Sequence, residues 1–133
     1  GGKPVSDLEH LCEVFHETAM TVWKVDAESV KMNLPYRFSD GALAMIEASM
    51  MPNGKVLVSD DRLIALHEPL TPVDIKAICR KAGLKYIMDD EDDTPPIYCE
   101  MYTVVDRREF CDAVWKIINA IVDARDIEMG RRR

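Results

Sequence analysis

The sequence predicts a single α+β domain with a mostly antiparallel sheet of about five strands, two long terminal helices packed on one of its faces, and a shorter middle helix. Three observations predict this fold class. Apolar residues recur at helical spacing near both ends of the chain, they alternate with polar residues in the segments between, and short turns join several of those segments. Strands joined by short turns pair antiparallel, and amphipathic helices must cover a sheet face to bury their apolar stripes.

Caps and apolar stripes define the first two helices. Ser6 opens a helix expected over residues 6–24, because Glu9 three positions later completes a capping box. Thr71 and the proline after it begin the middle helix. Gly83 ends it, since glycine adopts the left-handed conformation of a helix C-terminus at little cost. The expected buried stripe of this middle helix is Ile75, Ile78, Cys79 and Ala82.

The last helix is the longest predicted element. Asp106 and Glu109 are expected to cap it, and it is expected to end near residue 127. Phe15 of the first helix is expected to be buried with this last helix where the terminal helices meet the sheet. The predicted buried stripe, with Trp115 beside it, is Phe110, Cys111, Val114, Ile117, Ile118, Ile121 and Val122.

The strands are predicted from period-two alternation between turn signals. Proline cannot donate to a ladder, so Pro35 predicts that the first strand is an edge strand or is broken at this point. Residues 61–67 fit either a short strand or a helical turn. The middle helix can also serve as a crossover, which would place its two flanking strands in parallel. Strands are expected at residues 29–38, 42–51, 55–59, 84–88 and 97–105.

The expected domain covers residues 3–130. Gly1 and Gly2 are typical of a cloning scar. Residues 131–133 are expected to be a disordered basic tail, because three like charges after Gly130 have no apolar partner. No apolar run approaches the roughly 20 residues that span a bilayer, and no signal peptide is recognisable.

The four cysteines fall inside apolar segments, at spacings of neither a zinc site nor a redox pair. They are therefore interpreted as reduced core residues, which points to a cytoplasmic protein. Cys12 and His16 have metal-ligand spacing on the first helix, but two ligands do not make a site. No metal is expected. No cofactor is expected either, because a Gly-x-Ser-x-Gly elbow and phosphate-binding glycine loops are absent from the sequence.

Net charge and its distribution bear on partners. The chain carries 24 acidic and 17 basic side chains, a net charge of −7, which disfavours direct binding to nucleic acid or anionic membranes. Five carboxylates follow one another in Asp89, Asp90, Glu91, Asp92 and Asp93. This run lacks the alternating ligands and the glycine of an EF-hand loop. It is either a solvated loop or a surface that binds a basic protein partner.

A carboxylate cluster is the alternative candidate site. Asp60 and Asp61 end a predicted strand, and with Asp40 or Glu47 they can supply oxygen ligands to a divalent metal. Asp40, Glu47 and Lys55 also resemble the acid–acid–lysine set of metal-dependent nucleases, but the usual acid-x-lysine spacing is missing. The competing interpretation is that the paired aspartates bond local backbone amides in a tight turn.

About two thirds of the chain resembles an uncharacterised family of bacteria and prophages, the domain of unknown function numbered 1828. The resembling stretches are residues 38–41, residues 54–61 ending in Ser59-Asp60-Asp61, and the helices at residues 75–78 and 109–121. In the family pattern a glycine tends to follow the acids, where this chain has Arg62. The resemblance implies a compact bacterial or phage protein and supplies no catalytic residues.

These observations lead to two hypotheses for function. The first is a non-enzymatic acidic interaction protein, carried by a phage or mobile element, that binds a basic protein partner. The second is a small metal-dependent hydrolase that uses carboxylates near Asp60 and Asp61. Self-association remains open. Converging carboxylates in a concave pocket would favour the hydrolase, and a broad acidic face without a pocket would favour the binding protein.

Overall fold

The computed structural model describes residues 21–89, 96 and 98–132. They form an α+β fold with one antiparallel sheet of six strands, one more than predicted, in the order β1-β2-β3-β4-β6-β5. Successive strands from β1 to β4 are neighbours, and β6 lies between β4 and β5. The strands are β1 (Val22–Lys24), β2 (Ser29–Arg37), β3 (Leu43–Met50), β4 (Val56–Ser59), β5 (Lys85–Met88) and β6 (Cys99–Val105).

The additional strand, β1, corrects the predicted extent of the first helix. Val22–Lys24 pairs antiparallel with β2, with Trp23 opposite Lys31, so a helix beginning at residue 6 cannot continue to residue 24. Sheet pairing therefore outweighs the helical preference predicted for the end of this segment. The rest of that predicted helix, including Phe15, Cys12 and His16, lies outside the described residues.

Every pair of neighbouring strands is antiparallel. The crossover alternative is nevertheless confirmed, because β4 and β5, which flank the middle helix, are both antiparallel to β6 between them and therefore run parallel to each other. The pairing of β2 with β3 is irregular between Asn33 and Arg37, which is the stretch that contains Pro35. The prediction of an edge strand or of a break at this proline is therefore wrong: β2 lies between β1 and β3 and runs without interruption from Ser29 to Arg37. Only its register with β3 shifts, and pairing resumes at Arg37 opposite Leu43, because an irregularity in the ladder accommodates a residue that cannot donate.

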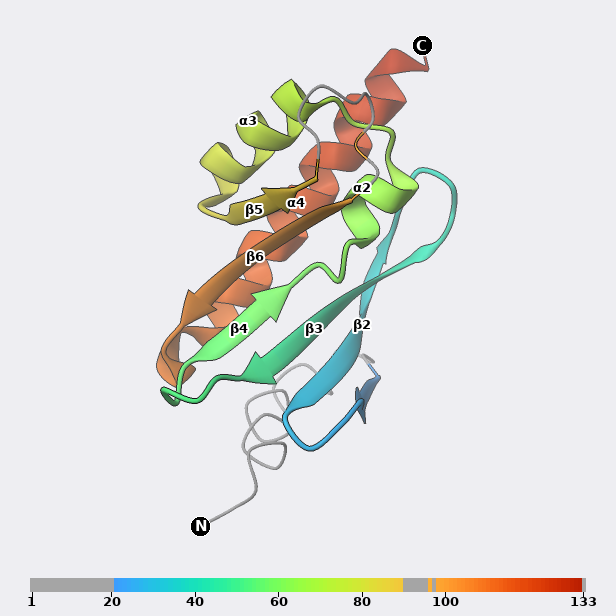
Figure 1. Ribbon diagram of the computed structural model, residues 1–133. Helices are drawn as coiled ribbons and strands as arrows, with labels where there is room; N and C mark the ends of the chain where they lie inside the picture. The colour runs from blue at the N-terminus through green and yellow to red at the C-terminus, as the bar shows by residue number, and fades with distance from the viewer. Residues whose placement is uncertain (1–20, 90–95, 97, 133) are drawn as a thin grey trace.

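The described helices are α2 (Leu63–His67), α3 (Pro72–Ala82) and α4 (Phe110–Arg131). The ambiguous segment 61–67 is therefore a turn followed by a short helix. A complete capping box between Thr71 and Asp74 begins α3, and Gly83 ends it at φ 76°, as predicted. Figure 1 shows α4 running along one face of the sheet with α3 beside it. There α4 packs across β3, β4 and β6, while α3 packs on α4 and β5.

Packing of α4 on the sheet forms the main core. Most of its predicted stripe is buried, as the spacing indicated, but Cys111 and Val122 are exposed, and this part of the prediction is wrong. Compared with the predicted stripe, the buried face of α4 is rotated about the helix axis toward small residues. Small residues allow the helix to approach the sheet closely. The buried residues of the helix are Phe110, Ala113, Val114, Ile117, Ile118, Ala120, Ile121, Ala124 and Glu128.

Both ends of α4 differ from the prediction. A 3₁₀ turn over Arg107–Glu109 precedes the helix, and neither Asp106 nor Glu109 forms a side-chain cap. At the other end the helix continues through Arg131, so the expected disordered tail is wrong for the described part of it. Arg131 lies 2.6 Å from the Asp74 carboxylate, and Arg132 lies 3.1 Å from Glu128.

The described cysteines are all free thiols, and they differ in burial. Cys79 and Cys99 are buried free thiols, as predicted, whereas Cys111 is an exposed one. Burial raises the pKa of the Cys79 and Cys99 thiols to about 12.

Across the described residues, no helix has both the length and the apolar character needed to cross a membrane.

Candidate functional site

The turn that links β4 to α2 contains the paired aspartates. Asp60 is only 1% exposed, and its carboxylate accepts three backbone N–H bonds, from Arg62 at 3.0 Å, Ile64 at 3.2 Å and Met101 at 3.0 Å. In return the Asp60 amide donates to the Met101 carbonyl. The Asp60 side chain therefore links the start of α2 to β6 through hydrogen bonds, and both of its carboxylate oxygens serve as acceptors.

The backbone of this turn adopts a conformation that favours glycine. Asp61 and Arg62 have φ angles of 56° and 67°, both in the left-handed region. Aspartate tolerates this region better than arginine does. The left-handed angles aim successive N–H groups of the turn at Asp60. Glycine adopts this region without steric cost, so Arg62 occupies a backbone position that favours glycine.

Substitutions of Arg62 measure the strain at this position. Arg62→Gly is expected to be more stable than Arg62→Ala by about 1 kcal/mol, because only glycine adopts the left-handed region without steric cost. Both variants lose the arginine side chain, so its contacts cancel in the comparison. Denaturant unfolding of the two variants checks this. Equal stabilities would show that the turn relaxes to another conformation.

Burial sets the protonation of Asp60. Removal from water raises the pKa of this carboxyl from 3.8 to about 7, and the negative charge of Glu100 acts in the same direction. The three backbone N–H donors oppose the shift but do not cancel it. Asp60 is thus a buried carboxyl group that titrates close to neutral pH in the folded protein.

The shift predicts a pH dependence of stability. Between about pH 4 and pH 7 the folded state keeps a proton on Asp60 that the unfolded state releases, so the free energy of unfolding should fall as pH rises through this window. The slope from one group approaches about 1.4 kcal/mol per pH unit. Asp60→Asn removes this contribution and should flatten the profile. Parallel pH profiles for the two proteins would contradict the assignment.

Asp61 points in another direction, toward the open face of the sheet. Its carboxylate lies 2.9 Å from Lys31, which is 3.9 Å from Glu47. Desolvation and the charge of Asp61 raise the pKa of Glu47, and Lys31 opposes this. Ser59 donates to Glu100 at 2.6 Å on the same face. Of these groups, Lys31, Glu47 and Ser59 belong to one cross-strand row, whose successive partners are Trp23, Lys31, Glu47, Ser59, Tyr102 and Lys85.

Asp40 belongs to a third location. Its carboxylate lies 2.6 Å from Nδ1 of His67, whose ring stacks on Phe38 at a centroid distance of 4.9 Å. The His67 hydrogen bond lowers the pKa of Asp40, and the Ala42 amide adds to this. Next to this pair, Ser39 donates through both its amide and its hydroxyl to the buried Glu68 carboxylate.

The four candidate carboxylates therefore do not converge on one point. Asp60 caps backbone amides in the core, Asp61 and Glu47 surround a lysine, and Asp40 pairs with a histidine. Lys55 precedes β4, at the opposite end of that strand from Asp60. Among the residues that the structure describes, no three histidine, cysteine or acidic side chains are arranged to hold a metal ion.

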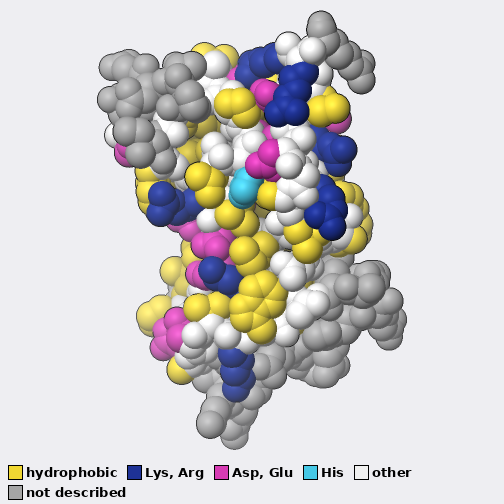
Figure 2. All heavy atoms as spheres, turned by 90° about the vertical axis from the view of Figure 1, so that its right-hand side faces the viewer, with side chains coloured by type: hydrophobic (Ala, Val, Ile, Leu, Met, Phe, Trp, Pro, Cys, Tyr) yellow, Lys and Arg dark blue, Asp and Glu magenta, His cyan; other side chains and the backbone are white. Residues whose placement is uncertain are grey.

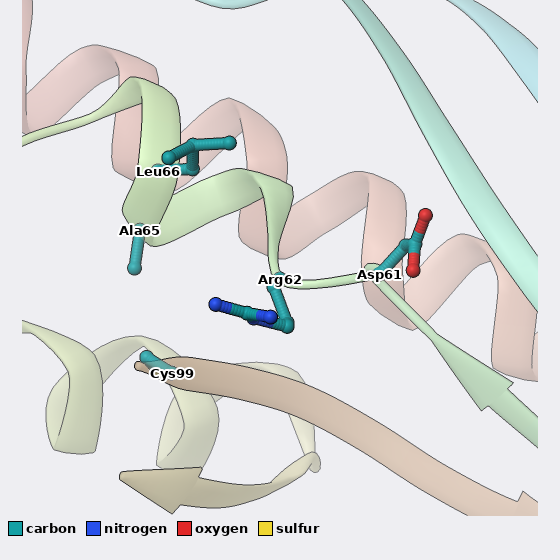
Figure 3. Close-up of a pocket in the computed structure, with 5 residues that line it drawn as sticks. All are labelled: Asp61, Arg62, Ala65, Leu66 and Cys99. Atoms are coloured by element: carbon teal, nitrogen blue, oxygen red, sulfur yellow. The ribbon is translucent and has the colours of Figure 1, made fainter. Parts of the chain in front are cut away.

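A hollow of about 260 Å³ lies beside the turn. Among its described lining residues there is no set of carboxylates that point at one another, as a hydrolase would need. Its lining residues are Asp61, Arg62, Ala65, Leu66 and Cys99. Figure 3 shows the Arg62 side chain reaching between α2 and the start of β6, whereas Asp61 points away from it. The Arg62 guanidinium lies over the Tyr98 ring, 4.3 Å from the centroid. Arg62 thus fastens the chain just before β6 to the turn.

Tyr98 also closes the base of the acidic loop. The Asp89 amide donates to the Tyr98 carbonyl at 3.2 Å, and the Tyr98 amide donates to the Asp89 carboxylate at 2.9 Å. Asp89 and Tyr98 therefore join the two ends of the loop through this pair of hydrogen bonds. The other members of the predicted partner-binding run, residues 90–93, lie outside the described residues.

The acidic excess of the chain is localised. Residues 1–20, 90–95 and 133 contain eight of the 24 acidic and two of the 17 basic side chains, so the described residues have 16 acids and 15 bases. Figure 2 shows one face of the molecule, on which described cationic and anionic side chains are interspersed with hydrophobic ones. This face therefore shows no broad acidic surface over the described residues.

Several contacts at the site were not predicted from the sequence. His67 and Glu68 had no assigned role, and no motif relates them to Ser39 and Asp40, about 28 residues earlier in the chain. The Arg62–Tyr98 contact was also missed. The adjacent aspartates at the end of a strand did indicate a tight turn, but nothing in the sequence indicated the left-handed conformation of Arg62.

The fold and the site define a two-layer α+β domain whose conspicuous buried carboxylate is structural. Comparison with known proteins finds no matching family model, no similar curated protein and no similar solved structure.

Proposed function

We propose that this protein is a non-enzymatic interaction domain that binds a basic protein partner through the acidic run at residues 89–93. The observation that supports this most is the localisation of charge. Acidic and basic side chains are nearly equal in number among the described residues, whereas four consecutive acids follow Asp89. Asp89 is hydrogen-bonded to Tyr98, and the Tyr98 ring contacts Arg62 at the start of α2. A dense cluster of like charge on a fixed base can steer and orient a partner of opposite charge.

The hydrolase alternative has less support. A carboxylate metal site needs several oxygen ligands that point at one ion. Asp60 instead uses both oxygens on backbone amides, and the charge of Asp61 is opposed by Lys31. The resemblance to domain of unknown function 1828 is retained as part of this proposal, and with it an origin in a phage or mobile element. The left-handed Arg62 is compatible with its glycine pattern. The buried thiols favour a cytoplasmic location.

The test compares association rates for a fluorescent decalysine peptide as the basic probe. Replacing residues 90–93 by their amides should slow association about tenfold at low salt and flatten its salt dependence, because these charges steer the encounter. The fold should be unaffected, since exposed loop charges contribute little to stability.

A matched control separates the loop from net charge. Replacing the exposed Asp26, Glu28, Asp40 and Glu109 by their amides removes the same number of charges from other parts of the surface. This variant should associate nearly as fast as the wild type. Equal slowing of both variants would mean that only total charge matters, and unchanged rates for the loop variant would refute the proposal.

A further inference from the structure

The outer face of α4 carries an exposed apolar stripe. Trp115, Val122 and Met129 are 50%, 38% and 37% exposed, and they recur every seven residues. Cys111 is exposed too and lies eighteen residues before Met129, which is about five turns, so the two share one line along the helix. Trp and Met are enriched in protein interfaces. The stripe therefore has the composition and the straightness of a helix-pairing surface.

Two hollows border this stripe and provide space for side chains from a partner. Each has a volume of about 320 Å³, and Tyr36 and Val122 line both. The first is bounded by Arg125 and Met129, and the second by Lys81 and Trp115. A partner that presents large apolar side chains at the spacing of one helix can thus fill a hollow on either side of Val122.

Charge is distributed asymmetrically across the stripe. At about 100° per residue, Asp112, Asn119 and Asp126 fall on one flank of the line through Val122, and Arg125 falls on the other. Arg125 is held on that flank by its hydrogen bond to the Arg37 carbonyl at 3.1 Å. A partner that complements this surface presents basic groups opposite Asp112 and Asp126 and an acidic group opposite Arg125.

We propose that the occupant of this surface is a second copy of the chain, in a two-fold dimer whose α4 helices run parallel. A two-fold axis parallel to the helices places the acidic flank of one copy against the basic flank of the other, so Arg125 meets Asp126 of the partner. An antiparallel pair would instead bring identical flanks together. This interface is independent of the acidic run at residues 89–93 and goes beyond the proposed function.

The oligomeric state tests the surface. Sedimentation equilibrium from 5 to 500 μM should show a dimer for the wild type, and Val122→Asp should weaken dimerisation by at least tenfold. Val73→Asp is the matched control, because Val73 is a helical valine that is 75% exposed on α3. It should dimerise like the wild type. A monomeric wild type throughout this range, or equal loss in both variants, would overturn the proposal.

Cross-linking through Cys111 tests the orientation. In a parallel pair the two Cys111 thiols face each other, whereas in an antiparallel pair centred on Val122 they lie about 33 Å apart. Mild oxidation of a Cys12→Ser variant should therefore give a disulfide-linked dimer that is lost on adding Cys111→Ser. Because this readout uses a native residue and needs no disruptive substitution, it does not depend on the folding of Val122→Asp. A dimer that fails to cross-link would refute the parallel arrangement.

Discussion

Replacing Asp60 by alanine is expected to lower the free energy of unfolding by about 3–5 kcal/mol, because it strands buried backbone donors. The Asp60 carboxylate accepts hydrogen bonds from the amides of Arg62, Ile64 and Met101, and its side chain is only 1% exposed, so these donors lie away from bulk water. Asp60→Asn should cost less, since its amide oxygen can still accept the bonds that Arg62 and Met101 donate to Oδ1.

Asp61→Ala provides the matched control one residue away. The Asp61 side chain is 28% exposed and bonded to Lys31, so its loss should cost less than about 1 kcal/mol. Denaturant unfolding of the three variants near pH 7.5 measures the difference. If Asp60→Ala and Asp61→Ala are equally mild, then Asp60 does not organise the turn, and its proximity to the amides is incidental.

Ile118→Ala is the second substitution with a large expected effect, a loss of about 2–5 kcal/mol. Ile118 is 2% exposed, on the buried side of α4 next to the exposed stripe. Truncating it removes apolar contacts and leaves a cavity that a helix held on both sides cannot close.

The control for this substitution is Val73→Ala, on the exposed side of α3. With 75% of its surface exposed, Val73 should contribute less than about 0.5 kcal/mol. Thermal and denaturant unfolding of both variants at low protein concentration make the comparison. A loss below about 0.5 kcal/mol for Ile118→Ala would show that α4 does not pack on the sheet through this face.

The candidate site illustrates what could be predicted about function. The terminal position of Asp60 and Asp61 on a strand was recognisable, and so was the possibility that they bond local amides. Their division between core and surface was not, because it depends on the left-handed φ angles of Asp61 and Arg62. The pairing of Asp40 with His67 depends on how the β2–β3 loop meets α2, and no local pattern encodes that contact.

The sequence by itself determined the α+β class, the middle helix with its capping box, and most of the buried stripe of α4, because caps and periodicity are properties of neighbouring residues. Only the tertiary structure decided that residues 22–24 form a strand, that β6 lies between β4 and β5, and that Arg131 docks on Asp74. Each of these depends on contacts between segments far apart in the chain, whose energy of pairing and burial outweighs local preference.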